Sequence, residues 1–470
     1  AGPAPWVQHL VNTALYAADC ALLFLVGRRF CSRRTAFAAA CLFAVLPVHC
    51  SVVAYASERG ELLLLLFLLL AWRELGRRRP RPWPGFLYYG LALASREQAL
   101  LFPILLALQD WVFLRRRFWH PPRRWVHLSA AGMSLSWLVL GRWISGGAAA
   151  GAPDYFEGLS YPVRLLTMAR FSLSHYAFPL VSGTGLQGDY ARPFFPDSRP
   201  ADLASWAVLL AAAVLLGWAI RGVLRQRSRY AFWTLFAFLL WLPESNLLGA
   251  SAVLGSDRAL FMPSIGYCFA LAMAFSRVGM PWRAVAVLAL LGWYGGLSAA
   301  RNRVWADERR FQEEAARVNP HSKGLASLGI SLLERGRKTE AEEILEEAAR
   351  LGPGLSEPHF HLGKVLWDGG DPARAESYFK RAAELSPRDP DTRVFLGLIA
   401  EKTGRPLEAQ ARYEEALALR PGDTAAKYAY VRLLLRTGRA HGARPLLEEF
   451  LKLWPKDPDA PRARAALKSP

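Results

Sequence analysis

Ten apolar stretches occupy most of the first three hundred residues, and they constrain the fold more than any other feature of the sequence. Each approaches the ~20 residues that a helix needs to cross a bilayer. Lipid offers the backbone no hydrogen-bond partners, so spanning segments of this kind must be helices packed in a bundle. They lie at about 7–26, 35–55, 61–72, 83–95, 99–114, 125–144, 203–220, 230–243, 259–276 and 282–300.

Arginine clusters between these stretches predict their orientation. Cytoplasmic loops carry the excess of basic residues, so all five clusters should face the cytoplasm. Residue 1, the loops 145–202 and 244–258, and everything after residue 300 then lie outside. Residues 163–180 are interpreted as an amphipathic helix in the membrane interface, because one more span would move a basic cluster outside. The clusters are Arg28–Arg34, Arg73–Arg81, Arg115–Arg124, Arg221–Arg229 and Arg277–Arg283.

Composition divides the chain into two parts. All nine lysines lie at Lys323 or later, and the residues after about 300 have the pattern of a soluble helical protein. The net charge of +19 therefore comes mainly from arginines beside membrane segments. These arginines are scattered over loops, which argues against nucleic-acid binding. The five cysteines lie in or beside apolar stretches without a C-x-x-C pair, which argues against a disulfide framework or a zinc site.

The second part repeats every 34 residues. This spacing, with small residues where two helices approach and a proline at the end of each unit, is the signature of tetratricopeptide repeats. We expect a connecting half-repeat helix at 304–320, four repeats at 321–457 and a C-terminal cap or tail at 458–470. The recurring residues are Gly336, Gly370, Gly404 and Gly438; Ala341, Ala375, Ala409 and Ala443; and Pro353, Pro387, Pro421 and Pro455.

These patterns predict an all-α chain, with a polytopic transmembrane helix bundle at 1–303 followed by a repeat superhelix. The concave face of such a superhelix usually binds an extended peptide or a partner protein. A rigid spacer or assembly platform with no bound peptide remains the alternative.

Polar residues gather at the predicted outer boundary of the bundle. An ionisable side chain at this depth is costly unless it faces a cavity or a partner. Each group also has a structural explanation: a turn at Arg96 and Glu97, a capping ion pair at Asp257 and Arg258, a hydrogen-bonded His49. Together they predict a polar cavity in which Arg96 and Arg258 receive a phosphate. The groups are His49, Cys50, Ser51, Glu58, Arg59 and Glu61; "SREQ" from Ser95; "GDY" from Gly188; and "PESN" from Pro243 with "SDRALFMPSIGY" from Ser256.

Four motifs follow one another along the chain: "LPVHCSVVAYASERGELL", "LALASREQALLFPILLALQDW", "LPESNLLGASAVLGSDRALFMPSIGYC" and "NRVWADERRF" running into the repeats. In these motifs and their order the chain resembles the transmembrane and tetratricopeptide-repeat O-mannosyltransferases, which have a GT-C fold, over almost its whole length. The resemblance implies transfer of a sugar, mannose by the family name, from a polyprenyl-phosphate donor. The acceptor would be a serine or threonine hydroxyl of an extracytoplasmic protein that the repeats help to hold.

The resemblance also implies roles for particular residues. Arg96 and Arg258 would bind the donor phosphate. A carboxylate would take the proton of the acceptor hydroxyl during direct displacement with inversion, and the arginines would stabilise the departing phosphate. A metal requirement is left open. Catalytic positions would be His49, Arg59, Glu61, Glu97 and Asp189, with Asn246 and Asp257 in support.

The chain departs from the family pattern in three ways, and the first two favour a second hypothesis, a non-catalytic membrane-anchored repeat scaffold or receptor. The family's first span and its outer loop with an acidic pair would precede residue 7. Ser51 stands where relatives have a glutamate, and Arg96 replaces their lysine. The arginine-rich, lysine-poor first part indicates a bacterium, hence an inner-membrane protein with periplasmic repeats. In a eukaryote the expected location is the endoplasmic reticulum membrane with lumenal repeats.

Overall fold

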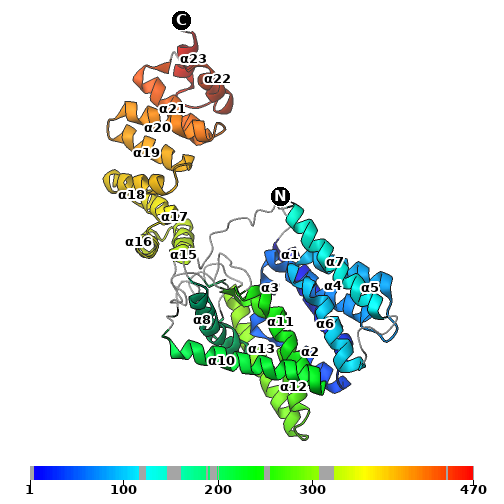
Figure 1. The fold of residues 1–470 in the computed structure, drawn as a ribbon. Coiled ribbons are helices and arrows are strands. Elements are labelled where there is room, and N and C mark those ends of the chain that lie inside the picture. Colours follow the sequence, from blue (N-terminus) through cyan, green and yellow to red (C-terminus); the bar gives the residue numbers. More distant parts are fainter. Residues whose placement is uncertain are drawn as a thin grey trace. The chain divides into compact units, whose positions relative to one another are not determined.

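The computed structural model describes residues 5–115, 123–144, 160–186, 189–190, 198, 201–247, 255–305, 322–440 and 443–468. The chain divides into two compact units, Ala1–Phe311 and Gln312–Pro470 (Figure 1). Nearly all described secondary structure is helical, so the predicted all-α class is confirmed. The predicted connecting helix at 304–320 lies outside the described residues, apart from two residues that end α13.

The first unit is a bundle of helices around one apolar core. Its two strands are only two residues long each and pair with one another. The elements are α1 (Pro5–Gly27), α2 (Arg33–Val45), η1 (Pro47–His49), α3 (Cys50–Ala54), η2 (Ala56–Glu58), α4 (Arg59–Leu75), α5 (Pro82–Ser95), η3 (Glu97–Leu101), α6 (Phe102–Gln109), η4 (Asp110–Leu114), α7 (Arg123–Ile144), α8 (Tyr161–Phe171), η5 (Ser172–Ala177), α9 (Phe178–Ser182), β1 (Asp189–Tyr190), α10 (Leu203–Arg221), η6 (Gly222–Gln226), α11 (Arg229–Trp241), η7 (Leu242–Glu244), β2 (Gly255–Ser256), η8 (Asp257–Leu260), α12 (Pro263–Phe275) and α13 (Trp282–Trp305).

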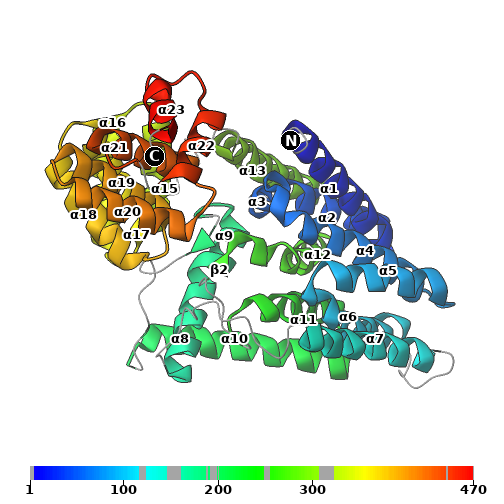
Figure 2. The same ribbon diagram turned by 90° about the horizontal axis from the view of Figure 1, so that it is seen from above.

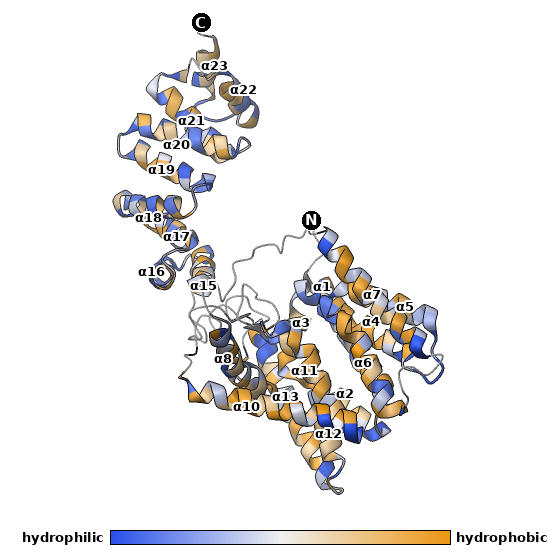
Figure 3. Ribbon diagram, viewed as in Figure 1, coloured by the Kyte–Doolittle hydropathy of each residue, from blue (hydrophilic) through white to orange (hydrophobic). Residues whose placement is uncertain are grey.

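Four helical segments are long and apolar enough to cross a membrane: Trp6–Gly27, Glu97–Leu114, Leu203–Gln226 and Trp282–Trp305. The last two bury only 11% and 6% of their most apolar windows, so their hydrophobic surface is available to lipid. Figure 3 shows hydrophobic residues along most of α10 and α13. This composition agrees with a membrane protein. The count of ten spans remains a prediction, since α4, α5, α11 and α12 are shorter helices of 13 to 17 residues.

The stretch predicted as one span at 35–55 is instead bent. Arg33–Val45 and Pro47–Ala54 meet at 53°. Leu46 between them is extended, with φ −64° and ψ 125°. A residue before proline avoids the helical region, and proline has no N–H to continue the helix. Pro47 therefore ends α2 and directs the following segment, which carries His49 and Glu58, across the end of the bundle.

The second unit is a stack of helical hairpins (Figure 2). In the first three hairpins a glycine lets the two helices approach: a Cβ on Gly363, for example, would lie 2.8 Å from the Phe379 ring. The turns hold Gly336, Gly370 and equivalent glycines at φ 69° to 85°, which only glycine adopts without strain. The helices are α15 (Ser322–Glu334), α16 (Lys338–Leu351), α17 (Ser356–Asp368), α18 (Pro372–Leu385), α19 (Pro390–Lys402), α20 (Pro406–Leu419), α21 (Thr424–Thr437), α22 (Arg444–Leu453) and α23 (Ala460–Lys468).

Candidate functional site

Three segments far apart in the sequence bring their charged residues together in the first unit. Glu58 ends η2, Arg96 lies in the turn between α5 and η3, and Arg258 belongs to η8. The Arg96 backbone is fully extended, with φ −157° and ψ 150°, which carries its side chain toward the start of α4. Gly60 leaves room for it, since a Cβ there would lie 3.2 Å from the Arg96 Nε. The local backbone thus positions both arginines around one carboxylate.

The Glu58 carboxylate bridges the two arginines. Its Oε2 accepts a hydrogen bond from an Arg96 terminal nitrogen at 2.8 Å, and its Oε1 accepts one from Arg258 at 2.8 Å. The side chain of Glu58 is 10% exposed, whereas Arg96 and Arg258 are 27% and 33% exposed. The anion is therefore nearly enclosed while both cations keep an open side. Two guanidinium groups around one anion form a site that suits a phosphate as well as a carboxylate.

A second carboxylate completes this cluster. Glu61 is 1% exposed, and its Oε1 lies 3.3 Å from the Arg96 Nε. Its Oε2 is buried and has no hydrogen-bond partner among the described residues. Beside it, the Gln98 amide donates to the Glu244 carboxylate at 2.8 Å. Two acids thus flank Arg96, and one of them retains a free acceptor oxygen.

The two outer loops meet beside this cluster. Strands β1 and β2 pair Asp189 with Ser256 and Tyr190 with Gly255, so the predicted "GDY" and "SDR" groups are neighbours. Asp257 is fully buried, and its carboxylate accepts a hydrogen bond from Arg301 of α13 at 2.6 Å. This ion pair fixes the residue that precedes Arg258.

Arg301 also contacts the predicted outer loop at 145–202, because its other terminal nitrogen donates to the Leu186 carbonyl at 2.7 Å. Asn246 is buried in a left-handed turn with φ 55°, and its carbonyl accepts a hydrogen bond from Arg164 of α8. Burial, followed by the nearby Glu244, raises the pKa of Tyr176 in the predicted interfacial segment. The predicted interfacial segment and both outer loops therefore lie close to one another.

Two of the predicted catalytic residues take part in other contacts. His49 is 2% exposed, and its ring nitrogens bond to Ser264 at 2.9 Å and to Tyr16 at 2.7 Å. The Arg59 Nε donates to Asn12 at 2.9 Å, and one of its terminal nitrogens is buried without a partner among the described residues. His49 and Arg59 thus connect the site segment to α1 and α12, and neither forms a hydrogen bond or ion pair with the Glu58 carboxylate within the described structure.

Glu97, another predicted catalytic residue, takes no part in the contacts described above. It is exposed and forms no side-chain hydrogen bond or ion pair within the described part of the chain. The sequence pattern gave no signal for Arg301. It placed Glu58 in the polar group around His49 but assigned it no role, and only the folded structure shows that Glu58 lies between Arg96 and Arg258.

No cluster of three or more His, Cys, Asp or Glu side chains among the described residues has the geometry to hold a metal ion. The metal requirement of any reaction here therefore stays open, and the described chemistry is that of paired arginines and carboxylates.

The comparisons with known proteins agree with both units. A tetratricopeptide-repeat family model matches residues 308–356, 360–409 and 394–461. Protein O-mannosyl-transferase Tmtc1 of Drosophila melanogaster is 26% identical over 77% of this chain and 53% of its own length. Protein O-mannosyl-transferase F38B6.6 of Caenorhabditis elegans is 25% identical over 74% and 51%, and human Protein O-mannosyl-transferase TMTC4 is 24% identical over 71% and 53%.

This chain thus spans about half the length of the curated relatives it matches. Among solved structures, the tetratricopeptide-repeat protein YrrB is 23% identical, with a TM-score of 0.29 over 37% of this chain and 89% of its own. The MamA protein is 21% identical, with a TM-score of 0.29 over 33% and 88%. The match to the mannosyltransferases covers both the helix bundle and the repeats.

Proposed function

We propose that this chain, a homologue of the transmembrane and tetratricopeptide-repeat O-mannosyltransferases, transfers mannose from a polyprenyl-phosphate donor to serine or threonine hydroxyls of an extracytoplasmic protein. The observation that supports it most directly is the Glu58 carboxylate held between Arg96 and Arg258. An anion already occupies the place where a donor phosphate would bind. The similarity to named O-mannosyl-transferases supports the sugar and the class of acceptor.

In this mechanism the arginines act on the leaving group. Arg96 and Arg258 bind the donor phosphate in place of the Glu58 carboxylate, and they stabilise the negative charge that develops as the phosphate departs. The acceptor oxygen forms a bond to the anomeric carbon while the bond from that carbon to the phosphate oxygen breaks. The electron pair of the broken bond leaves with the polyprenyl phosphate, and the configuration at the anomeric carbon inverts.

A carboxylate of the cluster takes the proton of the acceptor hydroxyl. Glu61 suits this role because its Oε2 is not used by another described residue. A general base must lie within hydrogen-bond reach of the proton that it removes. Glu58, released from the arginines when the phosphate binds, is the second carboxylate within reach. Asp189 and Glu97 lie on the neighbouring outer segments and would line the path of the acceptor.

His49 and Arg59 are assigned positioning roles. His49 joins Tyr16 of α1 to Ser264 of α12, and Arg59 joins the start of α4 to Asn12 of α1. Asn246 and Asp257 hold the loop that carries Arg258. The repeats would bind the acceptor chain, as their family does for extended peptides.

A repeat scaffold without catalysis is the second candidate, because the repeat unit has apolar cores that belong to it alone. A comparison of sugar donors distinguishes the transferase from the scaffold. The purified chain in proteoliposomes is given radiolabelled mannose, either on a polyprenyl phosphate or on a nucleotide diphosphate, together with a membrane-protein extract. We expect label in protein only with the lipid donor. Label from neither donor would favour the scaffold, and label from the nucleotide alone would refute the lipid-phosphate mechanism.

A further inference from the structure

The opposite, arginine-rich end of the first unit holds a cluster that the proposed reaction does not use. The loops 28–34 and 73–81 contain nine arginines and one glutamate, Glu74. We call these two loops the arginine cluster. Arginines held close together repel one another, and a bound anion would offset that repulsion.

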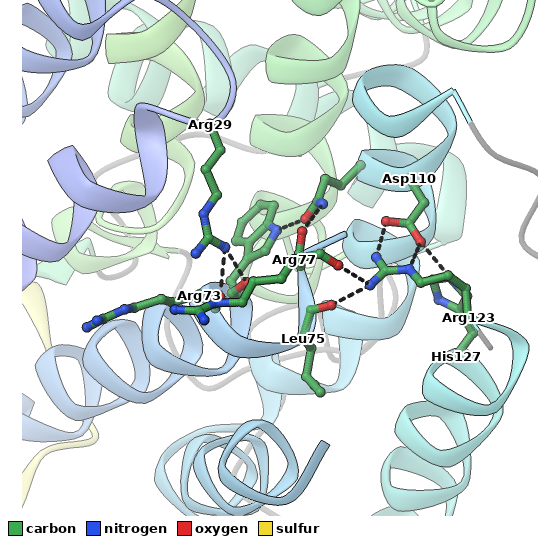
Figure 4. Close-up of polar contacts among 10 residues, drawn as sticks. Arg29, Arg73, Leu75, Arg77, Asp110, Arg123 and His127 are labelled. Carbon is green, nitrogen blue, oxygen red and sulfur yellow. Dashed lines mark hydrogen bonds and ion pairs between the residues drawn. The ribbon is translucent and has the colours of Figure 1, made fainter. Parts of the chain in front are cut away.

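Contacts between the two loops hold this charge in one place (Figure 4). Arg29 donates to the Arg73 carbonyl at 2.7 Å, which seats the first loop on the C-terminal end of α4. The Arg77 Nε donates to the same carbonyl at 3.2 Å. Burial, followed by repulsion from Arg77, lowers the pKa of Arg29. The fold thus keeps arginines close enough to repel one another.

A neutral framework underneath supports this arrangement. Arg123 is fully buried, pairs with Asp110 through two nitrogens, and donates to the carbonyls of Leu75 at 2.6 Å and Arg77 at 2.9 Å. The Arg81 N–H donates to the Glu74 carbonyl at 3.1 Å and turns the second loop back over α4. Arg123 and Asp110 thus neutralise one another inside the unit, and the arginines of the two loops receive no charge compensation from them.

The one acid in the cluster cannot neutralise it. Glu74 lies 3.5 Å from both Arg73 and Arg77 through a single oxygen. Arg78 and Arg79 are exposed and form no side-chain hydrogen bond or ion pair with the described residues. The same holds for Arg33 and Arg34. Four guanidinium groups are therefore available to an external anion.

The surroundings indicate which anion. Trp83, two residues after the second loop, is 87% exposed, and Phe37, three residues after the first, is 61% exposed. Leu25, one turn before Arg28, is 43% exposed. Exposed tryptophan next to apolar helix surface is typical of the level of lipid head groups in a membrane. A soluble polyanion would gain nothing from these aromatic neighbours, whereas a phospholipid would contact both them and the arginines.

From this placement we propose that the arginine cluster is a binding site for the phosphate head group of an anionic phospholipid. Orientation of the chain in the membrane requires basic residues in these loops but not their gathering by backbone contacts. Clustered arginines beside a membrane segment recognise anionic lipid head groups by charge. A bound lipid would offset the repulsion among the arginines and fix the two loops against each other.

Native mass spectrometry tests the proposal on the full chain, released from detergent with equal amounts of phosphatidylglycerol and phosphatidylcholine. We expect retention of phosphatidylglycerol to exceed that of phosphatidylcholine several-fold. The double variant Arg78→Gln/Arg79→Gln should reduce this retention by about three-fold or more. A second variant, Arg33→Gln/Arg34→Gln, should act in the same way. All four residues are exposed, so thermal unfolding should be unchanged.

The matched control is Arg221→Gln/Arg225→Gln, which removes two exposed arginines from the end of α10 and from η6, on the same predicted side. It should leave retention unchanged. Equal retention of the two lipids by the unaltered chain would overturn the proposal, as would equal losses in the control and test variants. Displacement of the lipid by an equal concentration of inorganic phosphate would show a site for free phosphate and would also overturn it.

Discussion

At the scale of single residues, buried charges decide which contacts this fold depends on. Both ends of the bundle contain an arginine–carboxylate contact, but they differ in exposure. Arg123 and Asp110 are almost fully enclosed and satisfy one another (Figure 4), whereas Arg96 and Arg258 keep an open side around Glu58. The closed pair is therefore structural, and the open one is suited to a ligand.

Arg123→Ala should destabilise the first unit strongly, because it leaves the buried Asp110 without its partner. Loss of one member of such a pair costs about 3–5 kcal/mol. Thermal unfolding of the chain in detergent measures this loss of stability. Arg124→Ala is the control, since Arg124 is exposed and lies over the Trp125 ring at 5.2 Å. Equal melting temperatures for the two variants would contradict a structural role for Arg123.

In the repeat unit, His361 should make stability depend on pH. Burial, followed by the neighbouring Lys364, lowers the pKa of His361 from 6.5 to about 4. In the unfolded chain His361 therefore takes up a proton near pH 6.5. In the folded chain it does so only near pH 4. Stability is complete above pH 6.5 and falls as the pH drops toward 4.

The His361 ring is partly exposed, so we expect a loss of about 1 kcal/mol between pH 7.5 and pH 5. Urea unfolding of residues 312–470 at the two pH values measures it. His361→Gln should reduce the difference between the two midpoints. Since Glu376 has a pKa of about 2, it does not titrate in this range. An unchanged difference in the variant would contradict the assignment to His361.

At the scale of elements, α13 connects to the site through one residue. Arg301 near its C-terminal end holds Asp257 at 2.6 Å and the Leu186 carbonyl at 2.7 Å. The two outer loops are thus tied to one helix, and the position of Arg258 depends on that tie.

Arg301→Ala should misplace Arg258 and weaken donor binding more than the chemical step. We expect the KM for the lipid donor to rise by about ten-fold, the effect of losing a charged hydrogen bond, while kcat changes less. Arg301→Lys should restore part of the affinity. Arg303→Ala, an exposed residue on the same helix, serves as the control. A fall in kcat at constant KM would contradict a positioning role.

The sequence predicted these elements to different degrees. The 34-residue period identified the repeats, because each repeat packs mainly on its neighbours and local pattern suffices. Charges at membrane depth stand out from apolar surroundings, so the sequence singled out Arg96, Arg258 and Asp257, whose roles stay predictions. Contacts between distant segments were not predictable: Glu58 became central only through the bend at Pro47, and His49 proved to be enclosed by Tyr16 and Ser264.

At the scale of the whole molecule, the two units differ in the residues that characterise them. The bundle holds paired arginines and carboxylates at one end and the arginine cluster at the other, while the repeats form a separate apolar core. A membrane enzyme that modifies proteins needs both a donor site beside lipid and a surface for a protein chain. The homology to O-mannosyl-transferases extends over both units.

Transfer of radiolabelled mannose from a polyprenyl phosphate to protein is the measurement that tests the central claim most directly. Three chains are compared in proteoliposomes: the unaltered one, Arg258→Ala, and Arg277→Ala, in which an exposed arginine outside the site is removed. We predict transfer by the first and third, and a loss of about 100-fold or more in Arg258→Ala, as for other groups that stabilise a leaving charge. Equal transfer by Arg258→Ala and the unaltered chain would contradict the account.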